Sequence, residues 1–226
     1  MTKQNLYTQD TIIASASAAG IGGINVIRIS GPDTEDIART VLGRIPQPRV
    51  ATYKKFLNDS QDILDMGVAI YFPAPDSFTG ESVLELHAHG GNFIGANIIK
   101  EIISMGARYA APGEFSKRAY LNGKIDLIQA EAIADLISSG TQKSAKAALN
   151  SLSGVFSDSV KDLNDQLINL RLFVEAAIDF PEEELDFLSD EKLINQIQIC
   201  DQSFRRIHSN TKHGQILNDG LKIAII

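Results

Sequence analysis

Glycine and proline are distributed unevenly along this chain, and their distribution constrains the fold more than any other feature. Residues 1–120 contain 12 of the 17 glycines and 6 of the 7 prolines, whereas residues 121–226 contain 5 and 1. Because both residue types interrupt regular structure, the first part should consist of short elements joined by turns, and the second can form long helices. We therefore expect an α+β protein, in which a mixed α/β domain is followed by a long-helix bundle domain.

Hydrophobic patterns place the elements of the first domain. Alternating and β-branched runs predict strands at residues 24–29, 65–72 and 82–87, with weaker candidates at 11–15 and 51–56. Helical periodicity predicts one helix over residues 33–42 and a second from about residue 91 to Gly106. The mixture of short strands and helices is typical of an α/β or α+β domain.

The second half has the pattern of long helices. Asp126 and Gln129 have the spacing of a capping box at the start of one helix. Apolar residues then recur at spacings of three and four from Leu149 towards Pro181, which predicts one long helix with an apolar seam. A further helix should begin at Ser189 and end at Gly214. Such a pair of helices needs another surface to bury both seams.

Charge, cysteine content and hydropathy exclude several classes of protein. The net charge is −7, and residues 121–226 carry most of the acidic excess. This lowers the expectation of a nucleic-acid binder without excluding a local basic patch. Cys200 is the only cysteine, and the sequence shows neither a secretory signal nor an apolar run of about 20 residues. We therefore expect a cytoplasmic protein with no membrane segment.

Two charged residues lie in the middle of predicted strands. Arg28 shares a strand face with Ile24 and Val26, and Glu85 is flanked by β-forming neighbours. Arg28 could reach water, pair with a carboxylate or contact an anion or ring system of a ligand. Glu85 could be solvated on an open sheet face or kept for a hydrogen-bond donor.

Histidines and acidic residues give weaker signals. His87 and His89 have neither a cysteine nor a third histidine nearby, so a zinc site is not expected. Gly90 and Gly91 could turn backbone N–H groups towards an anion, but a tight turn is the more usual explanation, because their spacing matches neither the dinucleotide-binding nor the phosphate-binding motif. The acidic residues 182–184 should lie in a solvated interhelix loop, with metal binding as the minor alternative.

The densest pattern is APGEFSKRAYLNGKIDLIQAEA at residues 111–132. It reads as a turn, a short helix with the adjacent cations Lys117 and Arg118, an Asn-Gly turn, Lys124 and a capped helix. An interdomain hinge with solvated charges would explain it. Alternatively, Lys117, Arg118 and Lys124 are the only dense candidates for a local basic patch that contacts nucleic acid.

Here the sequence resembles a known family, the bacterial and organellar tRNA modification GTPases called MnmE or TrmE. Further similar segments follow in the same order, namely DTIIA (10–14), GINVIRISG (23–31), SFTGE (77–81), HGG (89–91), AALNSLSG (147–154) and EAAIDFP (175–181). The resemblance implies a folate-binding and dimerisation domain over residues 1–120, similar to aminomethyltransferases. It also implies the first part of a helical domain over 121–218 and the start of a Ras-like G domain at 219–226.

The resemblance also implies a site. The cofactor-binding residues would be Arg28, Glu85 and Lys124, and the cofactor 5-formyltetrahydrofolate or another one-carbon tetrahydrofolate. No catalytic or metal-binding residue is expected in this sequence, because the family binds GTP, magnesium and potassium in the G domain. The run Leu221–Ile226 would be the first strand of that domain, so we expect this chain to lack GTPase activity.

The implied partners are a second copy, bound through the N-terminal domain, the flavin-dependent protein MnmG (GidA) and tRNA. The whole protein would hydrolyse GTP and, with MnmG, install a carboxymethylaminomethyl group on the wobble uridine of certain tRNAs. Two other interpretations stay open at this point. The chain could be a dimerisation and partner-docking module with no folate role, or a free-standing folate-dependent methyltransferase.

Overall fold

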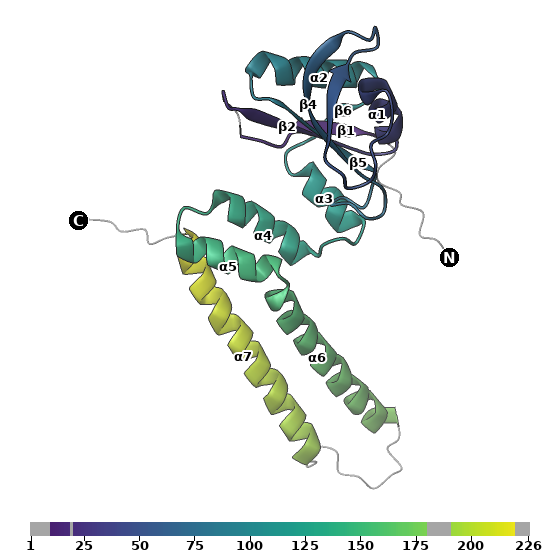
Figure 1. Ribbon diagram of the computed structural model, residues 1–226. Helices are drawn as coiled ribbons and strands as arrows, with labels where there is room; N and C mark the ends of the chain where they lie inside the picture. The colour runs from purple at the N-terminus through teal and green to yellow at the C-terminus, as the bar shows by residue number, and fades with distance from the viewer. Residues whose placement is uncertain (1–9, 19, 180–190, 220–226) are drawn as a thin grey trace, which may run out of the picture. The chain divides into compact units, whose positions relative to one another are not determined.

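The chain divides into two compact units at Ile125 and Asp126 (Figure 1). The computed structural model describes residues 10–18, 20–179 and 191–219. The division lies a few residues after the change in glycine and proline content near residue 120. An α+β architecture is confirmed, because strands occur only in the first unit of the described chain and the second contains helices alone.

A six-stranded sheet forms the framework of the first unit, with strand order β3-β4-β5-β2-β1-β6. Neighbouring strands are antiparallel except β1 and β6, which are parallel. The strands are β1 (Ile12–Ser15), β2 (Ile24–Ser30), β3 (Thr52–Leu57), β4 (Ile63–Phe72), β5 (Val83–His89) and β6 (Arg108–Tyr109). All five predicted strands are confirmed to within a few residues. Only β6 was missed, because two residues are too few to show a hydrophobic pattern.

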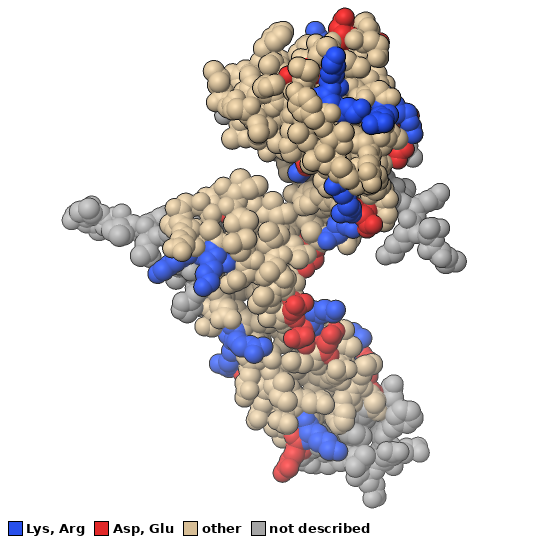
Figure 2. All heavy atoms as spheres, viewed as in Figure 1, with Lys and Arg blue, Asp and Glu red and all other residues tan. Residues whose placement is uncertain are grey.

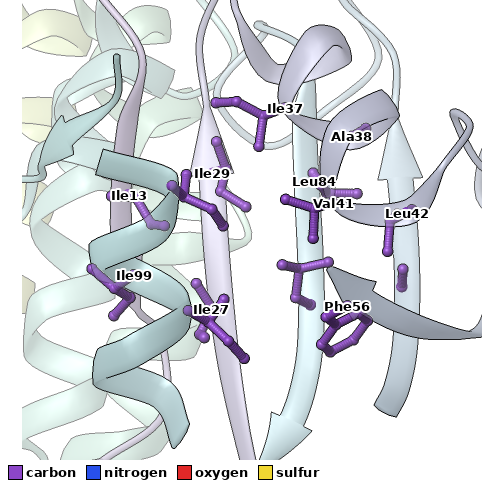
Figure 3. Packing of buried hydrophobic residues seen from close by; sticks show 14 of the residues in the cluster. Ile13, Ile27, Ile29, Ile37, Ala38, Val41, Leu42, Phe56, Leu84 and Ile99 are labelled. Atoms are coloured by element: carbon purple, nitrogen blue, oxygen red, sulfur yellow. The ribbon is translucent and has the colours of Figure 1, made fainter. Parts of the chain in front are cut away.

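Helices α1 (Thr34–Leu42) and α2 (Asn92–Ser104) pack on the same face of the sheet, and both were predicted (Figure 3). Between helices and sheet lies a core of aliphatic side chains that includes Ile27 and Ile29 of β2, both fully buried. Neighbouring residues of a strand point to opposite faces. Burial of Ile27 and Ile29 therefore leaves Arg28 on the face that α1 and α2 do not cover.

The second unit consists of α4 (Leu127–Ser138), α5 (Gln142–Leu152), α6 (Val155–Asp179) and α7 (Glu191–Asp219). The predicted capping box is confirmed, since Asp126 accepts a hydrogen bond from the backbone of Gln129 and the Gln129 side chain accepts one from Asp126 N. None of the helices in the described part of the chain combines the length and apolar character that a membrane crossing requires.

Two helix boundaries differ from the prediction. The single helix expected from Leu149 onwards is two helices, because the chain turns at Ser153 and Gly154, where Gly154 has φ of +89°. That conformation favours glycine and ends α5. The helix expected to end at Gly214 instead continues to Asp219, since a single glycine lowers helix stability without always ending a helix.

The two long helices pack against each other and run antiparallel, as Figure 1 shows. Their described surfaces still expose apolar side chains, which agrees with the prediction that the pair needs another surface; examples are Leu167, Leu172, Ile197 and Phe204. Pro181, the acidic residues 182–184, Ser189 and the predicted strand 221–226 lie outside the described residues.

Candidate functional site

Arg28 and Glu85 lie directly opposite each other on the neighbouring central strands β2 and β5. Arg28 Nη2 is 2.7 Å from Glu85 Oε1, and Arg28 Nε donates a hydrogen bond of 2.8 Å to the same oxygen. Their side chains are 28% and 15% exposed, so both can be reached from solvent. Pairing with a carboxylate was one of the alternatives left open for Arg28, and the structure shows this pairing with Glu85.

Two aromatic rings flank the Arg28 guanidinium. Phe78, in the loop between β4 and β5, and Phe115, in α3 (Glu114–Leu121), each have a ring centroid 5.7 Å from Arg28 Cζ. This distance is within the range of a cation–π contact, which limits where the guanidinium can move. Sequence reasoning missed both rings, because they are far from Arg28 along the chain and neither lies in a predicted strand.

His87 adds a titratable group to the same face. Its Nε2 is 3.5 Å from Glu85 Oε2, so Glu85 has a neighbour on each of its two oxygens. The face thus presents a carboxylate that accepts hydrogen bonds, a guanidinium that donates them, and aromatic surfaces beside them. This combination suits a planar, nitrogen-rich ring system with N–H donors.

Lys124, the third predicted residue, lies against a different part of the same region. Its side chain is exposed, and its aliphatic stem covers Gly80, at which an added Cβ would lie 3.2 Å from Lys124 Cγ. Gly80 also has φ of +78°, a conformation that favours glycine. The structure thus brings Arg28 and Glu85 together, and it places the stem of Lys124, which follows α3, against the loop that carries Phe78.

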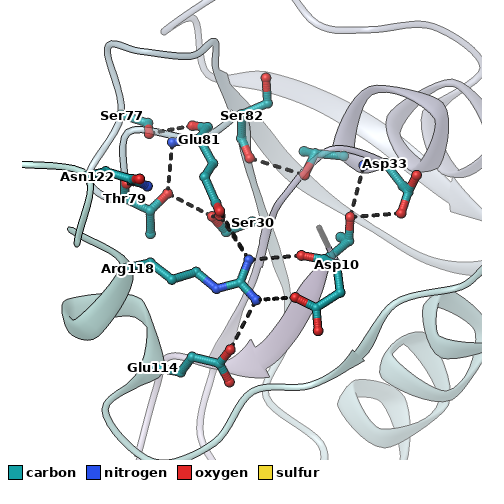
Figure 4. Close-up of polar contacts among 12 residues, drawn as sticks. Asp10, Ser30, Asp33, Ser77, Thr79, Glu81, Ser82, Glu114, Arg118 and Asn122 are labelled. Atoms are coloured by element: carbon teal, nitrogen blue, oxygen red, sulfur yellow. Dashed lines mark hydrogen bonds and ion pairs between the residues drawn. The ribbon is translucent and has the colours of Figure 1, made fainter. Parts of the chain in front are cut away.

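Arg118 of α3 lies at the centre of a buried ionic cluster (Figure 4). Its side chain is 1% exposed, and it contacts three carboxylates. Arg118 Nη2 is 2.8 Å from Asp10 Oδ1 and 3.0 Å from Glu114 Oε1, and Nη1 is 3.1 Å from both oxygens of Glu81. The prediction that Arg118 is a solvated cation or part of a surface basic patch is therefore wrong. Its burial requires the paired carboxylates, because an unpaired buried charge is costly.

Arg108 of β6 supports the exposed side of this cluster. It binds both oxygens of Glu114, at 2.9 Å and 2.6 Å, and it also pairs with Asp10. Hydrogen bonds from Arg108, with smaller contributions from Ala111 N and Arg118, lower the pKa of Glu114 to about 2, although burial opposes them. The same two arginines lower the pKa of Asp10. Both carboxylates are thus held in their charged form.

The low pKa of Glu114 predicts a pH dependence of folding. A depressed pKa in the folded state stabilises the fold above the ordinary pKa of 4.5, and this contribution is lost as the pH falls towards about 2. Glu114→Gln should therefore weaken the dependence of unfolding free energy on pH between about pH 5 and about pH 2. Urea unfolding across that range measures it. Glu131→Gln, at an exposed position of α4, is the control and should unfold with the same pH dependence as the parent chain. If the unfolding free energy of Glu114→Gln depended on pH as strongly as that of the parent, the low pKa of Glu114 would be contradicted.

Glu81 connects the cluster to the loop that carries Phe78. Glu81 Oε2 accepts a hydrogen bond of 2.7 Å from Ser30 Oγ, which is also 2.7 Å from Thr79 Oγ1. Asn122, just after α3, donates a hydrogen bond of 2.7 Å to Thr79 O. The loop is thereby attached both to the end of β2 and to the segment that follows α3.

The histidines and glycines at the end of β5 have structural partners. His89 Nδ1 is 2.8 Å from Asp65 Oδ1 on β4, and no group of metal-ligating side chains is found among the described residues. An added Cβ at Gly90 would lie 2.2 Å from Gly22 O, so glycine is required there for two chain segments to approach closely. On the face shown in Figure 2, basic and acidic side chains are interspersed over the helical unit.

Comparison with known proteins places both units in one family. The family described as GTP-binding protein TrmE N-terminus matches residues 11–124, and the MnmE helical domain family matches residues 127–222. Proteins named tRNA modification GTPase MnmE are 50% identical over 219 residues in Hydrogenovibrio crunogenus and 51% over 218 residues in Saccharophagus degradans. These matches cover 97% and 96% of this chain, but 49% and 48% of the relatives. The chain therefore spans about half the length of the curated relatives it matches.

Proposed function

Because the chain belongs to the MnmE (TrmE) family, we propose that it forms the N-terminal and first helical part of a tRNA modification GTPase and binds a reduced folate on the open face of its sheet. The observation that carries the proposal is the partly exposed Arg28–Glu85 pair between two aromatic rings. Reduced folates carry a planar pterin with N–H donors and an anionic tail. The face offers complementary groups for both.

Three residues would hold the folate. Glu85 would accept hydrogen bonds from the pterin amino and ring N–H groups, as ionised carboxylates do. Arg28, held in place by Phe78 and Phe115, would orient Glu85 and contact polar atoms of the ligand. Lys124 is exposed on the neighbouring loop and would attract the anionic part. When bound, 5-formyltetrahydrofolate would supply a one-carbon unit.

The role of Glu85 can be tested by calorimetric titration with 5-formyltetrahydrofolate. Glu85→Gln keeps the shape of the side chain but removes its charge, so affinity should fall about tenfold to a hundredfold, as expected when a charged hydrogen bond is lost. Glu131→Gln makes the same chemical change at an exposed position of α4 and should leave affinity unchanged. Equal affinity of Glu85→Gln and the parent chain would refute the role.

The remaining activities follow from the family and are proposed for the whole protein. Its G domain would bind GTP, magnesium and potassium, and hydrolysis would drive wobble-uridine modification together with the flavin-dependent MnmG. The N-terminal unit would also form a homodimer. The second candidate is a partner-docking module without a folate role, which the exposed apolar residues of α6 and α7 favour. Failure of the parent chain to bind folate would support that second candidate.

A further inference from the structure

The loop between β4 and β5 is the structural link between the separate parts of the proposed site. Phe78 of this loop contacts Arg28, and Gly80, two residues later, supports the stem of Lys124. Displacement of the loop would therefore change the surroundings of the guanidinium and of the lysine together.

Glu81 is the residue through which the loop is held. It lies next to Gly80 and binds two groups outside the loop, namely the Arg118 guanidinium and the Ser30 hydroxyl. Ser77 Oγ also donates a hydrogen bond to Glu81 O, which ties the middle of the loop to its end. The Glu81 side chain is 14% exposed, so its charge is partly removed from water and depends on Arg118.

Arg118 also holds the other side of the site. It lies on α3 three residues after Phe115, and its guanidinium binds Glu81 and Asp10, both outside that helix. One guanidinium therefore joins the helix that carries Phe115 to the loop that carries Phe78. Because Arg118 is 1% exposed, it cannot itself contact a ligand on the open face.

We propose that Arg118 and Glu81 are positioning residues for the ligand site on the open face of the sheet. Their ion pair fixes the loop so that Phe78 stays against Arg28 and Gly80 stays beneath Lys124. This inference rests on the proposed function for the identity of the ligand, but the positioning itself can be measured without any ligand.

A fluorescence experiment on the whole chain tests the positioning. The chain contains no tryptophan, so Phe78→Trp introduces a single indole into the loop. Phe78 is 39% exposed, so acrylamide quenching should be partial in this background, and it should rise when Glu81→Ala is added. Glu81→Gln should restore much of the protection, because its amide oxygen can still accept hydrogen bonds from Arg118 and Ser30. Ile98→Val, in the core on the opposite face, controls for a general loss of stability and should not change quenching.

Affinity measurements with Phe78 retained complete the test. Glu81→Ala should weaken binding of 5-formyltetrahydrofolate about tenfold, the size expected for coupled neighbouring groups. Unchanged quenching in Glu81→Ala, or an equal rise in Ile98→Val, would overturn the positioning role, as would unchanged folate affinity in Glu81→Ala. If the parent chain binds no folate while the quenching results hold, the proposed function fails and the positioning of the loop stands.

Discussion

Arg118→Met should destabilise the first unit by about 3 kcal/mol, the lower end of the range for breaking a buried ion pair. Methionine is apolar and of similar length, so it fills most of the space that the arginine occupies. What is lost is the cation shared by Asp10, Glu81 and Glu114, two of which are at most 14% exposed. Asp10 is half-exposed, so water can solvate its charge when the arginine is absent. We therefore expect a loss of stability at the lower end of that range.

Urea unfolding at neutral pH measures this loss. Lys117→Met makes the same change of charge at the neighbouring, exposed position of α3 and should alter stability by less than about 0.5 kcal/mol. The difference in unfolding free energy between Arg118→Met and the parent should also become smaller as the pH falls, because protonated carboxyl groups are neutral and no longer require a paired cation. If both substitutions had the same small effect, the ionic cluster would not contribute to stability.

Gly67→Ala should have an effect of similar size for a purely steric reason. Gly67 is buried in β4, and an added Cβ would lie 2.1 Å from His87 O and 3.2 Å from Phe56 Cε2. The carbonyl belongs to the backbone of β5, so it can move only if the pairing of β4 with β5 changes. Overpacking of this kind costs about 3 kcal/mol.

Thermal and urea unfolding of Gly67→Ala test this expectation. Gly140→Ala is the matched control, because nothing lies within 4 Å of its added Cβ, and it should be neutral or slightly stabilising. Since Glu85 lies two residues before His87 on β5, Gly67→Ala should also weaken folate binding if the proposed site is correct. If Gly67→Ala were as stable as Gly140→Ala, the backbone of β5 at His87 would have to move at little cost, and the steric argument would be wrong.

The sequence predicted best what depends on local periodicity. Alternation correctly placed Arg28 on the strand face that it shares with Ile24 and Val26, and it identified Glu85 as a carboxylate within a strand, because that pattern needs only neighbouring residues. Their pairing was not predictable in the same way, since the two residues are 57 positions apart and sheet order is set by contacts between distant segments. The family resemblance selected the same residues and added Lys124. The contact between the Lys124 stem and Gly80, in the loop between β4 and β5, became evident only in the structure.

The environment of Arg118 was misjudged for a related reason. Its immediate sequence, with Lys117 beside it, is typical of a solvated helix face, and only Glu114 among its carboxylate partners is nearby in the chain. Asp10 and Glu81 are 108 and 37 positions away. The break at Gly154 was missed because the apolar spacing continues across the turn, and hydrophobic periodicity contains no information about φ.

The contact between Asp10 and Arg118 also has a consequence for synthesis of the protein on the ribosome. Asp10, two residues before β1, cannot obtain this ionic partner until α3 has been translated and has left the exit tunnel, 108 positions later. Contacts of such large sequence separation form late and slow folding, and domains generally fold as units in the order of synthesis. We therefore expect the first unit to complete folding only when the segment joining it to the helices has emerged, so that α3 closes a domain whose strands are already present.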